Sequence, residues 1–245
     1  MYQERTYRSR ISPGNLNSFQ VVVKQTDLLV HAEKKLEKHT RELVLQQRGY
    51  LEAFIETHPD FATALSPWSL NSPAPQIITD MITASQAAGV GPMAAVAGAI
   101  AEHVGRGLLN VTDQVIVENG GDVYIKTEKP VTAAIFAGKS PLSMHVGLRL
   151  GGAFEPVAVC TSSGTVGHSL SLGRADAVCV VSQSCCLADA AATSIGNRIQ
   201  SAADIQDAMA AARRIDAVDG VMIIAGDKMA IWGDLQVLSL PLKKG

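Results

Sequence analysis

An aspartate and a threonine four residues apart are the first candidates for chemistry in this sequence. Asp189 and Thr193 lie in an alanine-rich stretch, and a helix would place both side chains on one face. A carboxylate and a hydroxyl are hard oxygen ligands, which suit Mg²⁺ because that ion takes few protein ligands alongside phosphate oxygens. The alternative is structural, since an aspartate is favoured in the first turn of a helix. The spacing predicts a candidate metal pair and leaves that alternative open.

A run of hydroxyl-bearing residues that leads to a histidine is the second candidate. Within the sequence CTSSGTVGHS, Thr161, Ser162, Ser163 and Gly164 precede His168. Backbone N–H groups and hydroxyls in such a loop can hold phosphate oxygens. The histidine could transfer a proton near neutral pH or contact a phosphate. An ordinary polar loop with a hydrogen-bonded structural histidine would have the same composition, so both interpretations stand.

A turn with adjacent glycines is the third candidate. Asn119, Gly120, Gly121 and Asp122 join two short β-rich segments, which predicts a hairpin. Such a turn favours glycine because the backbone there takes positive φ. The same bare backbone would let a ligand approach closely, with Asn119 and Asp122 as polar contacts.

The elements that must position these residues follow from hydrophobic spacing and turn residues. Helices are expected over 33–56, 76–88, 93–104 and 203–214, and strands over 19–24, 28–32, 115–118, 123–125 and 131–136, with two more within 143–160. Gly89 and Gly105 predict helix ends, and Pro92 predicts a helix start. Helices mixed with hairpins, without strict βαβ alternation, indicate an α+β fold with helices packed on antiparallel sheet.

Two parts of the chain resemble each other. The stretch 93–100 aligns with 188–195, and the hairpin over 115–125 aligns with 221–231. An additional helix in the second part accounts for the ten extra residues between its segments. We therefore expect two similar α/β halves.

These halves are expected to form a single domain over residues 1–245. The duplicated core would cover 75–240, and residues 1–70 would be a hairpin-helix extension. In the alignment of the halves, alanine and glycine take the places of Asp189 and Thr193. The core would therefore offer one acidic site instead of two.

Composition limits the classes of function. The chain has 21 basic and 23 acidic residues, which gives a net charge of −2 and no basic excess for nucleic acid or a membrane surface. The apolar run over 91–101 is too short to cross a bilayer, and residues 1–10 carry no apolar signal core. The four cysteines show no framework spacing. We therefore expect a cytoplasmic protein with reduced thiols and a small-molecule ligand.

The order of these motifs resembles the ApbE-type flavin transferases. Asn-Gly-Gly-Asp at 119–122, Thr-Ser-Ser-Gly at 161–164, a histidine, and Ala-Asp-x-x-x-Thr at 188–193 follow one another within roughly residues 75–240. The resemblance implies an α+β fold with duplicated units and the use of FAD and Mg²⁺. Family members attach the FMN portion of FAD to a threonine or serine hydroxyl of a target protein and release AMP.

The resemblance also implies roles for individual residues. Asp189 and Thr193 match the magnesium ligands, and the aspartate would also help to deprotonate the acceptor hydroxyl. Residues 119–121 match the flavin-site turn, and residues 163–164 match a Ser-Gly pair before a histidine of the catalytic region. His168 would take the place of that histidine.

Features usual in the family are missing from this sequence. After His168 the chain reads Ser-Leu-Ser-Leu-Gly, where the family continues with Ile-Ile-Asp-Pro, and 92–102 lacks the family's Lys-Gly-x-x-x-Asp. The usual lipoprotein signal is also missing. Three functions remain open: a magnesium-dependent transferase with an acceptor protein, a non-catalytic protein that binds a flavin or another heterocyclic metabolite, and a related enzyme on another phosphate-bearing substrate.

Overall fold

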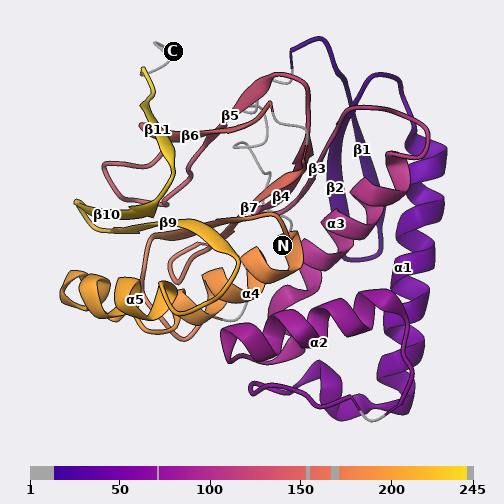
Figure 1. Ribbon diagram of the computed structural model, residues 1–245, viewed down its shortest axis with the longest axis horizontal. Helices are drawn as coiled ribbons and strands as arrows, with labels where there is room; N and C mark the ends of the chain where they lie inside the picture. The colour runs from indigo at the N-terminus through magenta and orange to yellow at the C-terminus, as the bar shows by residue number, and fades with distance from the viewer. Residues whose placement is uncertain (1–13, 71, 153–154, 167–170, 242–245) are drawn as a thin grey trace.

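Helices and two sheets stack in three layers (Figure 1). The computed structural model describes residues 14–70, 72–152, 155–166 and 171–241. The strands are β1 (Asn17–Val23), β2 (Thr26–Ala32), β3 (Val115–Asn119), β4 (Asp122–Lys126), β5 (Pro130–Ala134), β6 (Val146–Gly151), β7 (Val157–Ser162), β8 (Ala177–Ser182), β9 (Val218–Ala225), β10 (Lys228–Gly233) and β11 (Gln236–Ser239). The α-helices are α1 (Glu37–Thr57), α2 (Gln76–Ala88), α3 (Val96–Leu108), α4 (Cys185–Gly196) and α5 (Ile205–Ala212). Short 3₁₀ helices lie at Pro59–Ala62, Pro92–Ala95 and Ala202–Asp204.

The larger sheet has eight strands in the order β1-β2-β3-β4-β7-β8-β9-β10, and all neighbours are antiparallel. A three-stranded sheet, β11-β6-β5, lies against one face, and the helices cover the other (Figure 1). The fold is α+β, as the sequence predicted. Side chains alternate between the two cores: Val117 packs under the helices, whereas Ile116 packs toward the smaller sheet.

The first hairpin belongs to the larger sheet. β1 and β2 pair from Asn17 opposite Ala32 to Val23 opposite Thr26, and β2 continues the sheet onto β3. Both predicted strands are confirmed, with the turn at residues 24–25. Arg48 of α1 donates a hydrogen bond to Oγ1 of Thr26 at 2.9 Å, which ties the hairpin to the helix layer.

The helix layer confirms the predicted helices but moves several of their ends: α1 begins at Glu37 and not at residue 33, and Pro92 opens a short 3₁₀ helix before α3 begins at Val96. α2 has the predicted bounds, and Gly89 ends it with a φ of +71°. The prediction that Gly105 ends the next helix is wrong, because α3 continues to Leu108. Gly105 is needed for packing: an added Cβ would overlap the ring of Tyr124, with Cε1 at 2.7 Å. In the described ranges no single helix is long and apolar enough to cross a membrane, although α2 together with residues 92–108, bent by 105°, meets that test of length and composition.

β8 and β11 are not among the predicted strands. β8 reads AVCVVS, and all six of its residues are buried because helices and the smaller sheet cover its two faces. A strand buried on both faces shows no alternation of apolar and polar residues, so the periodicity that identifies most strands is missing.

Candidate functional site

The candidate residues gather at one end of the central strands of the larger sheet. There β3 ends at Asn119, β4 begins at Asp122, and β7 ends at Ser162. Asp122 pairs with Asn119 across the hairpin and with Cys160 on the other side. α4 packs on β7 and against α3, which places Asp189 near these strand ends.

The glycine turn is held between β7 and the start of α3. Gly120 has a φ of +75°, the conformation expected at this turn. A Cβ added to Gly121 would lie 2.7 Å from the carbonyl oxygen of Thr161, whose N–H donates to Gly121 O at 3.0 Å. The amide of Asn119 donates from Nδ2 to Ala97 O at 3.0 Å. The turn therefore has a structural role that local sequence did not reveal.

Asp189 reaches from α4 to the first turn of α3. Its Oδ2 accepts the Gly98 N–H at 2.9 Å, so the carboxylate caps a neighbouring helix and not its own. A Cβ on Gly98 would overlap the carbonyl oxygen of Cys185 and lie 2.8 Å from the Asp189 Cβ. Glycine at this position is therefore what lets α3 and α4 approach closely enough for the contact.

A second carboxylate makes the reverse connection. Glu102 of α3 is buried, and its Oε2 accepts the N–H of Cys186 at 3.1 Å and the hydroxyl of Ser184 at 3.2 Å. Arg106 pairs with its other oxygen at 2.6 Å. Each helix thus supplies a carboxylate to the N-terminal amides of the other, where the helix dipole favours negative charge.

Asp122 and Asp189 form a pair of nearby acids. Burial raises the pKa of Asp122 to about 7, and the neighbouring Glu118 charge adds to the rise, whereas the Cys160 thiol and the Thr161 amide oppose it. Burial also raises the pKa of Asp189 well above its ordinary value, and the Asp122 charge raises it further, against the amides at the start of α3. Within the described part of the chain, the groups that shift these pKa values include no lysine or arginine.

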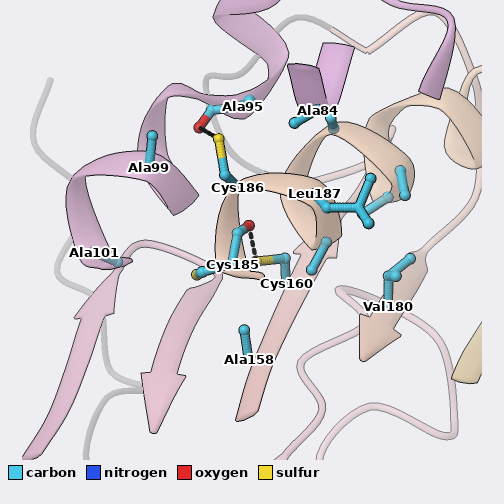
Figure 2. Close-up of a cluster of buried hydrophobic side chains, with 14 of the residues drawn as sticks. Ala84, Ala95, Ala99, Ala101, Ala158, Cys160, Val180, Cys185, Cys186 and Leu187 are labelled. Carbon is cyan, nitrogen blue, oxygen red and sulfur yellow. Dashed lines mark hydrogen bonds between the residues drawn. The ribbon is translucent and has the colours of Figure 1, made fainter. Parts of the chain in front are cut away.

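The cysteines beside this pair pack as buried apolar groups. The Cys160 thiol donates to Cys185 O at 3.3 Å, and the Cys186 thiol lies 3.9 Å from Ala95 O (Figure 2). All four cysteines are free and buried, and burial raises their thiol pKa values. Small side chains such as Ala99 surround the start of α4, which lets the helices and β7 lie close together (Figure 2).

The hydroxyl loop uses its amides inside the protein. The N–H groups of Thr165 and Val166 donate to the Ser163 Oγ at 3.1 and 3.0 Å, and Gly164 N donates to Ala175 O at 2.9 Å. The Thr161 hydroxyl donates to the Cys179 sulfur at 3.3 Å. The Thr165 hydroxyl donates to Asp176 Oδ1 at 3.0 Å, so these amides and hydroxyls already have partners within the chain.

Thr193, Ser162 and His168 are the remaining predicted site residues. Thr193 is half-buried one helical turn beyond Asp189, as the spacing predicted, and Ser162 lies near Gly196 at the end of α4. His168 lies outside the described residues. Among the residues that the structure describes, no group of three or more His, Cys, Asp and Glu side chains could hold a metal ion.

Sequence reasoning missed two residues that shape this site and one pairing within it. The alignment of the two halves marks Gly98 only as the counterpart of Thr193, and none of the predicted motifs includes Glu102. The available signal was that Glu102 is the only acidic residue in the apolar run over 91–104. The sequence predicts only ligand contact for Asp122, because its proximity to Asp189 depends on how α4 packs over the ends of the central strands.

Comparison with known proteins identifies the family. The family described as "AbpE bacteria" matches residues 8–225, which is most of the chain. The chain belongs to this family. It is also similar to a UPF0280 protein of Methanococcus vannielii, with 40% identity over 237 residues that cover 94% of this chain and 95% of that protein. A UPF0280 protein of Methanococcus aeolicus is 41% identical over 189 residues, which cover 75% of this chain and 76% of the relative.

Two solved structures have the same architecture as this chain. Flavinyl transferase ApbE of Pseudomonas stutzeri, in its apo form, superposes with a TM-score of 0.54 at 13% identity, covering 89% of this chain and 94% of that one. A mutant of flavin transferase ApbE from Vibrio cholerae gives a TM-score of 0.56 at 12% identity, covering 89% and 97%. At this level of identity the likeness shows the fold, and the activity needs its own argument.

Proposed function

We propose that this AbpE-family protein binds FAD with Mg²⁺ at the site formed by Asp122 and Asp189. It would transfer FMN to a hydroxyl of an acceptor protein and release AMP. The observation that carries the proposal is the pair of neighbouring acids, Asp122 of β4 and Asp189 of α4, the second of which is held by the first turn of α3. The flavin transferases that share the fold give the proposal its substrate class.

The donor set fits a divalent cation. Carboxyl groups of Asp122 and Asp189 raise each other's affinity for positive charge, and Thr193 adds a hydroxyl oxygen on the same helix face. The Gly98 N–H donates to Asp189 Oδ2 at 2.9 Å and the Ala97 amide also bonds this carboxylate, so its orientation is fixed at the start of α3. When bound, Mg²⁺ would offset the charge of a pyrophosphate.

The chain's own residues would bind and orient the nucleotide. The bare turn at Gly120–Gly121 allows close approach, and the hydroxyls of Thr161 and Ser162 stand at the adjacent end of β7. Asp189, with its raised pKa, would accept the proton of the attacking hydroxyl. Asn119, Ser163 and Gly164 hold the turn and the loop around these groups. His168 is proposed to assist in proton transfer or orientation.

The deciding experiment compares Asp189→Asn with the wild type in FAD titrations with and without Mg²⁺, followed by flavin fluorescence and by AMP analysis. Asparagine retains an oxygen for the Gly98 N–H and removes the charge, so the fold should persist while Mg²⁺-dependent binding weakens at least about tenfold. Asp219→Asn, at an exposed position of β9, serves as the matched control.

The proposal would be contradicted if the wild type bound FAD equally well with and without Mg²⁺ and a broad set of acceptor proteins yielded no AMP. Unchanged Mg²⁺-dependent binding in Asp189→Asn would remove Asp189 from the cation site. In that case the contact with Gly98 would be its whole role.

A second candidate is a protein that holds a flavin or another heterocyclic metabolite without turnover. The observation that favours it is the internal use of the site's polar groups, since Asn119, Asp189 and the 164–166 amides all bind within the chain. It predicts stoichiometric flavin uptake with no AMP. If no flavin binds at all, a related enzyme on another phosphate-bearing substrate becomes the better proposal.

A further inference from the structure

The two outer strands of the larger sheet differ in how their edges are covered. β1 and β10 are the terminal strands. At β1, Arg41 of α1 donates to the carbonyl oxygen of Val22 at 3.0 Å, so a side chain occupies the edge. In the described part of the chain, no strand pairs with the outer side of β10. An uncovered edge strand is a template for pairing with another chain.

The hairpin register shows which backbone groups of β10 point outward. β9 and β10 are joined by two residues, with Ala225 opposite Lys228. A two-residue loop closes on a hydrogen-bonded pair, and such pairs then alternate along the ladder. The N–H and C=O groups of Met229 and Ile231 therefore face away from β9. The β1–β2 hairpin also has a two-residue loop, with Val23 opposite Thr26. The N–H and C=O groups of Val22 therefore face away from β2, which agrees with the hydrogen bond from Arg41 to Val22 O.

The side chains of β10 suit a partner strand of the same sequence. Met229 and Ile231 are 39% and 41% exposed, whereas Ala230 and Trp232 pack on the helix-side core. Lys228 begins the strand and Asp234 directly follows it. In an antiparallel pair centred on Ile231, each Lys228 would stand opposite the Asp234 of the other chain.

We propose that β10 pairs with β10 of a second copy of this chain, antiparallel, about a twofold axis at Ile231. The arrangement places outward N–H and C=O groups of the two Ile231 residues opposite each other and joins the two sheets into one. It also exchanges the weak internal contact of Lys228 with Asp227, at 3.8 Å, for two contacts between chains. Registers centred between two residues would set an inward backbone group against an outward one, so the ladder disfavours them.

The test is the molecular mass of the full chain in solution, measured by sedimentation over a range of protein concentrations. The wild type is expected to dimerise. Ile231→Pro removes the outward N–H at the axis and should give a monomer, since proline is tolerated in an edge strand whose N–H faces away from its neighbour. Val22→Pro, at the outward position of the covered β1 edge, is the matched control and should leave the dimer intact.

A charge exchange tests the register without touching the strand interior. Lys228→Glu should weaken the dimer about tenfold, because each new glutamate would lie opposite the Asp234 of the other chain and the symmetric dimer contains this repulsion twice. Adding Asp234→Lys to that variant should restore the dimer. A wild type that stays monomeric at every concentration overturns the proposal, as does a dimer that survives both Ile231→Pro and Lys228→Glu. Circular dichroism of each variant separates loss of pairing from loss of folding.

Discussion

Replacing Gly98 with alanine tests the close contact of α3 and α4 on which the candidate site depends. The added Cβ would overlap the carbonyl oxygen of Cys185 and lie 2.9 Å from its carbonyl carbon and 2.8 Å from the Cβ of Asp189. Two of these neighbours are backbone atoms, so no side-chain rotation relieves them. The helices must separate, and the 2.9 Å hydrogen bond from Gly98 N to Asp189 must lengthen.

The expected loss combines three effects. Overpacking costs about 1–3 kcal/mol. Weakening of a hydrogen bond to a charged group adds up to about 1.5–3 kcal/mol. Alanine in a helix interior returns about 0.5–1 kcal/mol relative to glycine. We expect Gly98→Ala to lower the free energy of unfolding by about 1–3 kcal/mol, which agrees with these ranges when the hydrogen bond is only partly lost.

Urea denaturation followed by circular dichroism measures the change, with Gly49→Ala as the control. Gly49 is in the interior of α1, is exposed, and would meet no atom within 4 Å of an added Cβ. Alanine there should raise the free energy of unfolding by about 0.5–1 kcal/mol. If Gly98→Ala were as stable as Gly49→Ala, the close approach of the two helices would be refuted.

Other predictions follow from the same geometry. Glu102→Ala leaves the buried Cys186 N–H without its acceptor and should cost about 1–3 kcal/mol in urea denaturation, whereas Glu42→Ala on the exposed face of α1 should change little. Because the folded-state pKa of Asp122 is about 7, above the ordinary 3.8, its contribution to stability is present below about pH 4 and is lost as the pH rises through about 7. Asp122→Asn should flatten that decline in urea midpoints measured across this pH range, and an unchanged slope would contradict the pKa assignment. The four buried thiols should resist an aromatic disulfide reagent in the native protein and all react in denaturant; rapid reaction of the native protein would show that the layers covering these thiols open.

Local signals accounted for much of the fold. The bounds of α2 and its end at Gly89 follow from spacing and from one residue that readily adopts positive φ. Both hairpins at β1–β2 and β3–β4 follow from β-rich segments joined by short turns. These features were predictable because they depend on neighbours a few residues away.

Other features were not predictable because their partners lie far along the chain. Gly105 carried the same local signal as Gly89, yet α3 continues past it, since Tyr124 from β4 fills the space where a side chain would stand. β8 was missed because layers on both of its faces remove the alternation that marks a strand.

The candidate site shows the same division. Helical spacing predicted that Asp189 and Thr193 share a helix face, and adjacent glycines predicted the turn at residues 119–122. That Asp189 caps α3 and lies beside Asp122, which is 67 positions earlier in the chain (189 − 122), depends on how α4 packs in the folded protein. The physical reason is that glycine at position 98 admits α4 to the start of α3, and no short-range pattern encodes that contact.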